Sequence, residues 1–179
     1  MSTIRFILLI SLFFNLLGCR LDPGAQRAKA LMGEANSLLE QESRVTQEWS
    51  VEYGKVFTPQ NRAQFPSNRE SLRGHAEKVI SLLDESARLS SAAAEKYEQA
   101  VGLVNEDKEK RGLVLFAASF RKDVEITGLF KEQMRLAANS EIKDQKTFNE
   151  KFMNLTQLIE REKRKRDDQQ NEGKRLMGL

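Results

Sequence analysis

Apolar residues recur at steps of three or four along four long segments of the chain, with polar residues between them. This spacing places the apolar side chains on one face of a helix, so each segment is predicted to be an amphipathic helix. The predicted helices run from residue 22 to about 54, from 68 to 104, from 113 to 138 and from 144 onward. The chain shows no alternating strand pattern with glycine-rich turns.

Short local motifs mark where the helices begin and where they break. Asp22 precedes Pro23, and this pair suits a helix start because the carboxylate accepts bonds from free amides while proline has no N–H to satisfy. Residues 54–67 contain one glycine and two prolines, which interrupt a continuous helix. Ser67 and Glu70 have the spacing of a capping box and predict the start of the second helix.

The connection between the second and third helices allows two interpretations. Residues 105–111 are all polar, so they form either a hairpin loop or an exposed continuation of the helix. Gly102 and Gly112 on either side favour the loop. With the loop, the chain is predicted to be all-α, an antiparallel bundle of about four amphipathic helices with coiled-coil-like packing. With the continuation, it is an elongated three-helix coiled coil.

Aromatic residues in the last two predicted helices favour the compact bundle. Each buried phenylalanine contributes roughly 1.5–3 kcal/mol. The residues concerned are Phe116, Phe120, Phe130, Phe148 and Phe152. The bundle domain is predicted to span residues 22–170. Residues 171–179 are predicted to be a frayed tail, because no apolar residue lies between Ile159 and Leu176.

The first 18 residues have the three parts of an export signal. A short start carries one positive charge at Arg5, and residues 6–17 form an apolar stretch. These 12 residues would span about 18 Å as a helix, well short of the roughly 30 Å hydrocarbon core of a bilayer. Residues 1–18 are therefore predicted to be a signal peptide rather than a permanent membrane span.

The residues Leu16, Leu17, Gly18 and Cys19 resemble the cleavage box of bacterial lipoprotein precursors. The resemblance covers residues 1–20. It implies cleavage before Cys19, attachment of diacylglycerol and an N-acyl chain to Cys19, and a place outside the cytoplasm on a bacterial membrane. It also implies the outer membrane in a Gram-negative host, because Arg20 replaces the aspartate that favours inner-membrane retention in enteric bacteria. Residues 19–21 would form a lipidated tether.

Two other interpretations of the leader remain. In the first, the leader is an ordinary secretory signal and Cys19 is incidental. In the second, it is an uncleaved N-terminal anchor. Cys19 is the only cysteine, so an intrachain disulfide cannot explain it in an exported protein.

Composition and charge exclude several classes of function. Arg5 is the only charged residue among residues 1–18, so removal of this segment lowers the net charge from +3 to +2. This nearly balanced charge, together with an extracytoplasmic location, argues against a nucleic-acid partner. His75 is the only histidine, which predicts no catalytic triad, no di-iron site and no other metal site. We therefore predict no catalytic residue and no cofactor other than the covalent lipid.

Two surface features are candidates for contact with a partner. The basic run at residues 161–166 is either a contact for an anionic surface or a solvated helix end, and the second interpretation is favoured. Its cations are Arg161, Lys163, Arg164, Lys165 and Arg166. The aromatic residues Trp49, Tyr53, Phe57 and Phe65 are either packed inside or exposed as a contact patch, and packing is favoured.

Three functional hypotheses follow. The first is a non-enzymatic, membrane-anchored lipoprotein that acts as a binding or structural module in the bacterial cell envelope. Its partners are the membrane, through the lipid, and another envelope protein or polymer. The second is a carrier of an apolar small molecule between the helices, which requires a dry cavity. The third is an enzyme that uses carboxylates alone, which requires two acidic side chains converging in a cleft.

Overall fold

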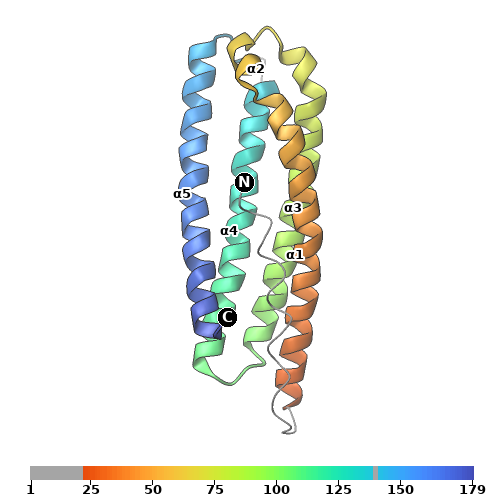
Figure 1. The fold of residues 1–179 in the computed structure, drawn as a ribbon, viewed down its shortest axis with the longest axis vertical. Helices are drawn as coiled ribbons and strands as arrows, with labels where there is room; N and C mark the ends of the chain where they lie inside the picture. Colours follow the sequence, from red (N-terminus) through yellow and green to blue (C-terminus); the bar gives the residue numbers. More distant parts are fainter. Residues whose placement is uncertain (1–21, 139–140) are drawn as a thin grey trace.

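The computed structural model describes residues 22–138 and 141–179. Within these ranges the chain forms α1 (Pro23–Val56), α2 (Pro59–Gln64), α3 (Arg69–Val101), α4 (Asp107–Ala138) and α5 (Gln145–Met177), with no strand. Figure 1 shows the four long helices running alternately up and down. The predicted antiparallel all-α bundle is therefore confirmed. The predicted signal peptide, the cleavage box, Cys19 and the tether lie outside the described residues.

The long helices pack in the order in which the chain visits them. α1 packs on α3, α3 on α4, and α4 on α5. The described parts of α1 and α5 do not pack against each other along their length. We call this side of the molecule the open edge, because a closed bundle would place a fourth helix–helix interface there. In Figure 1, α4 is visible between α5 and α1 on this side.

Two of the predicted helix starts are confirmed by their caps. The Asp22 carboxylate accepts a hydrogen bond from the amide of Gly24 at 3.1 Å, and Pro23 is the first residue of α1. The Asp144 carboxylate accepts one from the amide of Thr147 at 2.8 Å at the start of α5. Each cap satisfies an amide that has no partner inside its helix.

The predicted capping box is wrong. Asn68 is the N-cap of α3 and makes no side-chain capping bond. The Ser67 hydroxyl instead donates to the carbonyl of Gln64, at the end of α2. The chain leaves this short helix in a tight turn. The Ser67 side chain is bonded within that turn and does not cap α3.

The elongated three-helix alternative is also wrong, because α3 ends at Val101 and the chain reverses into α4. The turn lies over residues 102–106, slightly earlier than the predicted loop, and Asp107 already belongs to α4. Asp107 and Glu109 lie in the first turn of α4, where negative side chains stabilise the positive pole of a helix. Part of the polar stretch is therefore a helix start.

The predicted frayed tail is wrong as well. α5 continues to Met177, and Leu176 is buried. Gly178 has φ 73° and its amide donates to the carbonyl of Lys174, which is the usual glycine ending of a helix. Gly173 is buried against α4 although it carries no side chain. The segment is held by a close backbone contact that an apolar pattern does not reveal.

The core changes character along the bundle. Near the start of α1, alanines of α1 and α3 pack with larger side chains that include the rings of Tyr97, Phe116 and Phe120. At the opposite end, Phe65, Phe148 and Phe152 pack together with Ile142. Among the described helices, none has an apolar stretch long enough to cross a bilayer.

Candidate functional site

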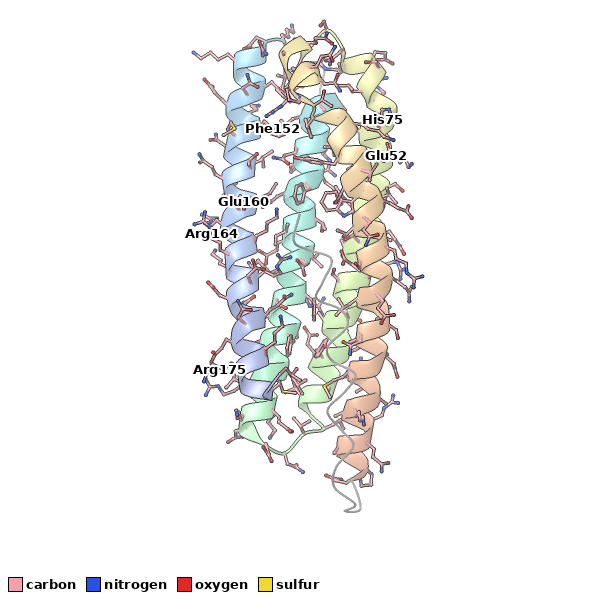
Figure 2. All side chains as sticks on the ribbon, viewed as in Figure 1. Glu52, His75, Phe152, Glu160, Arg164 and Arg175 are labelled. Carbon is pink, nitrogen blue, oxygen red and sulfur yellow. The ribbon has the colours of Figure 1, made fainter. Side chains whose placement is uncertain are left out.

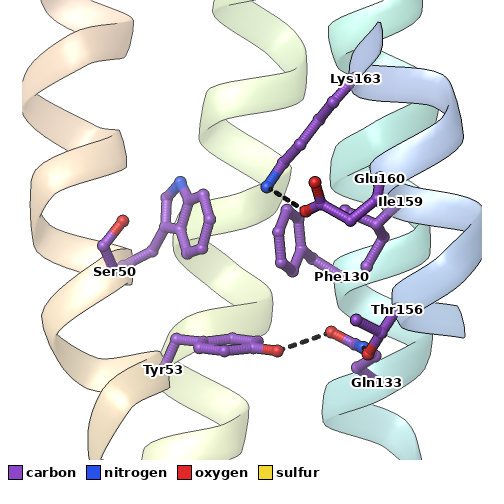
Figure 3. Close-up of a pocket in the computed structure, with 9 residues that line it drawn as sticks. Ser50, Tyr53, Phe130, Gln133, Thr156, Ile159, Glu160 and Lys163 are labelled. Atoms are coloured by element: carbon purple, nitrogen blue, oxygen red, sulfur yellow. Dashed lines mark hydrogen bonds and ion pairs between the residues drawn. The ribbon is translucent and has the colours of Figure 1, made fainter. Parts of the chain in front are cut away.

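A cavity of about 320 Å³ opens beside the open edge, between α1, α4 and α5 (Figure 3). Its volume is at the lower end of the range for small-molecule sites. We call it the α1/α4/α5 pocket. It is lined by Trp49, Ser50 and Tyr53 of α1, Phe130 and Gln133 of α4, and Thr156, Ile159, Glu160 and Lys163 of α5.

Three aromatic rings form one wall of the pocket. Phe130 lies 4.9 Å from Trp49 and 5.4 Å from Tyr53, measured between ring centroids. Trp49 and Tyr53 follow each other by one helical turn and meet edge to face at 6.1 Å. All three side chains are half-buried, so part of each ring surface remains accessible.

A hydrogen-bonded chain holds this wall to α5. The Tyr53 hydroxyl donates to Gln133 Oε1 at 2.7 Å, and Gln133 Nε2 donates to Thr156 Oγ1 at 2.9 Å. Burial raises the pKa of Tyr53 to about 12, so the hydroxyl keeps its proton as donor at any physiological pH. Gln133 is itself buried, and its bonds satisfy an amide that would otherwise be costly to bury.

An ion pair borders the pocket beside the Phe130 ring. Lys163 Nζ donates to Glu160 Oε1 at 3.1 Å and lies 5.4 Å from the centroid of the Phe130 ring. Figure 3 shows the Lys163 side chain reaching from α5 toward Phe130. The pocket therefore already holds an ammonium group between a ring face and a carboxylate. The ion-pair border is not the dry lining that the carrier hypothesis requires, so the structure does not favour that hypothesis.

The four aromatic candidates do not form one exposed patch. Trp49 and Tyr53 line the pocket. Phe57 turns toward Phe152 at 4.7 Å, and Phe65 is buried and stacks on Phe148 at 4.0 Å. The first pair can therefore meet a ligand, while the second pair packs the far end of the bundle.

The basic run is divided among several partners inside the molecule. Arg161 and Lys165 both contact Glu162, which also pairs with Lys122 of α4. Arg166 pairs with Asp123 of α4 at 2.8 Å. Lys163 belongs to the pocket, and Figure 2 shows Arg164 pointing away from the bundle. This division favours a helix face tied to α4 over a continuous surface for anions. Contact of the basic run with an anionic surface stays a prediction.

Sequence reasoning missed a charged cluster between α1 and α3. The Glu52 carboxylate accepts bonds from Lys55 at 2.9 Å, Lys78 at 3.0 Å and His75 Nδ1 at 2.8 Å. Glu52 and His75 lie side by side in Figure 2. The bonds from Lys55, Lys78 and His75 lower the pKa of Glu52 to about 2. The only histidine thus joins an ion cluster that links two helices, and its hydrogen-bond partner within the described residues is the Glu52 carboxylate.

This cluster predicts a loss of stability in acid. The pKa of Glu52 is lower in the folded protein than its ordinary value of 4.5, so its contribution is complete above pH 4.5 and is lost as the pH falls toward 2. In thermal melts from pH 6 to pH 2, the melting temperature of Glu52→Gln should depend less on pH than that of the wild type. Glu77→Gln, an exposed change on α3, should keep the wild-type slope. Equal slopes for all three proteins would contradict the role of Glu52.

Comparison of the chain with protein-family models, with curated proteins and with solved structures found no match. The candidate function therefore depends on the residues themselves. Within residues 22–138 and 141–179, no group of three or more His, Cys, Asp or Glu side chains is placed to hold a metal ion. The absence of a metal, of a cofactor and of a catalytic role stays a prediction.

Proposed function

We propose that this protein is a lipid-anchored module of the bacterial cell envelope that binds or braces another envelope component outside the cytoplasm. The observation that carries the proposal is the position of Cys19, directly after Leu16, Leu17 and Gly18 and three residues before the Asp22 cap of α1. Acylation would supply about 0.8 kcal/mol for each buried methylene, so two or three chains would hold the protein on a bilayer almost permanently.

The short tether supports a role close to the membrane. Three residues extend at most about 10 Å, which keeps the start of α1 near the bilayer. α1 itself has 34 residues and is about 51 Å long. A rigid body of this length can present contacts at a distance from the surface, but it cannot search a wide volume as a domain on a long disordered linker can.

The proposal predicts that Cys19→Ala abolishes processing and lipid attachment. In a bacterium that processes lipoproteins, the wild-type chain should lose residues 1–18 and carry the mass of its acyl chains, because the thiol at Cys19 is the acceptor. The variant should keep its leader and lack the lipid. Intact mass spectrometry of the membrane and soluble fractions measures both outcomes.

Arg20→Ala is the matched control, since it changes the neighbouring residue and leaves the cleavage box intact. It should be processed and lipidated as the wild type is. Recovery of the wild-type protein without lipid, with a free thiol and in the soluble fraction, would overturn the proposal.

The binding role needs its own test, because an anchor alone does not show a partner. Photo-crosslinking from Ser50, an exposed position at the pocket border, should recover a defined envelope protein or polymer. Crosslinking from Val114, an exposed apolar position on α4, serves as the comparison. Recovery of no defined partner from either position would count against a binding module and leave the anchor unaffected.

A further inference from the structure

The α1/α4/α5 pocket contains the elements of a site for a positively charged nitrogen. Aromatic ring faces attract ammonium groups through their negative quadrupole, and tryptophan does so most strongly. Here Trp49, Tyr53 and Phe130 form a continuous aromatic wall, and the Glu160 carboxylate lies at the border of the same cavity. A carboxylate beside such a wall adds charge attraction to the ring attraction.

The protein's own Lys163 shows how a cation is held there. Its ammonium contacts Glu160 and faces the Phe130 ring at 5.4 Å. The Lys163 side chain is 35% exposed and that of Glu160 is 54% exposed, so this pair is accessible from solvent. Exposed ion pairs contribute little to stability, so Lys163 can leave the ring at small cost.

We propose that the α1/α4/α5 pocket binds an organic ammonium ion, and that Lys163 occupies the position of this ligand when the pocket is empty. A ligand ammonium would contact the aromatic wall and Glu160 while Lys163 turns outward. The site lies far from the tether, since Trp49 follows Pro23 by 26 residues, or about 39 Å along α1. The proposal concerns the ammonium group itself, whichever small molecule or polymer carries it, and it does not depend on lipidation.

Substitutions at Lys163 and Glu160 should change the affinity for an ammonium ion in opposite directions. Lys163→Gln removes the internal competitor and should tighten binding of tetramethylammonium by about threefold or more, because a tethered group competes at high effective concentration. Adding Glu160→Gln to that variant should weaken binding by about two- to fivefold, because it removes an exposed charge partner. Arg164→Gln is the matched control, since Arg164 is the next residue on α5 and points away from the bundle.

Trp49 makes the measurement direct, because it is the only tryptophan in the chain and lines the pocket. The full chain, purified in a non-ionic detergent, is titrated with tetramethylammonium chloride while its tryptophan fluorescence is recorded. Potassium chloride at equal ionic strength corrects for salt. Circular dichroism melts establish that each variant is folded before its titration is interpreted.

A saturable response that is tighter in Lys163→Gln, weaker in the double variant and unchanged in Arg164→Gln supports the proposal. The absence of any saturable response beyond that of potassium chloride in folded Lys163→Gln would overturn it. Weaker binding of tetramethylammonium to Lys163→Gln than to the wild type would also overturn it. Sodium benzoate provides the third arm, since saturable benzoate binding that disappears in Lys163→Gln would identify an anion site instead.

Discussion

Replacing Phe148 with alanine is expected to lower the free energy of unfolding by about 3–5 kcal/mol. Phe148 is 1% exposed and is among the largest fully buried side chains of the described residues. Its ring stacks on Phe65 at 4.0 Å and lies 5.9 Å from Phe152 and 6.4 Å from Phe57. The ring therefore joins α5 to the end of α1 and to the turn after α2. Alanine would leave a cavity lined by the remaining rings.

Urea denaturation followed by circular dichroism measures this loss, and an unchanged slope with a lower midpoint would show that the variant still unfolds as one unit. Met153→Ala on the same helix is the matched control. Met153 is 50% exposed, so its truncation should change the free energy of unfolding by less than about 0.5 kcal/mol. A similar small change for Phe148→Ala would contradict the packing at this end of the bundle.

Replacing Gly173 with leucine is expected to lower the free energy of unfolding by about 2–3 kcal/mol. A Cβ atom at this position would lie 3.3 Å from the carbonyl oxygen of Gly112 and 3.5 Å from Phe116. The nearer of these atoms belongs to the backbone of α4 and cannot rotate away. The remaining carbons of leucine would force α5 away from α4 near its end. The buried contact of Leu176 would weaken with it.

Gly74→Leu is the control for this substitution and should have the opposite sign. Gly74 is exposed on α3, and nothing lies within 4 Å of a Cβ atom placed there. Leucine is a better helix former than glycine, so this variant should be more stable than the wild type by about 0.5–1 kcal/mol. If both leucine variants raised the stability, the close contact between α4 and α5 would be refuted, and only helix propensity would be acting.

The open edge connects the fold to the proposed ammonium site. Because α1 and α5 do not pack along their length, Phe130 of α4 is only half-buried on this side. Phe130 and Gln133 are the α4 residues that line the pocket there. Near the end of α1 and the start of α5, the rings of Phe57 and Phe152 lie 4.7 Å apart. This contact lies one helical turn from Tyr53 and from Thr156, which line the pocket.

Much of the fold was predictable because helix formation is governed by local sequence. The caps at Asp22 and Asp144 and the break around the two prolines depend on residues within one turn of each other. The buried end of α5 was not predictable in this way. Gly173 has no apolar side chain and contributes nothing to an amphipathic pattern, yet it lets two backbones approach closely. The capping box failed because Ser67 had a nearer acceptor in the preceding turn.

The sequence by itself determined the helical class, the limits of most helices, and the box at Cys19 on which the proposed anchor depends, because each of these is encoded in a few neighbouring residues. The tertiary structure alone decided the pocket. Trp49, Phe130 and Lys163 come from three helices and meet only because α1 and α5 flank α4 without packing on each other. It also decided the partners of the charges. Lysine, arginine and acidic residues alternate so evenly that many pairings fit the sequence, and only the packing of the helices selects among them.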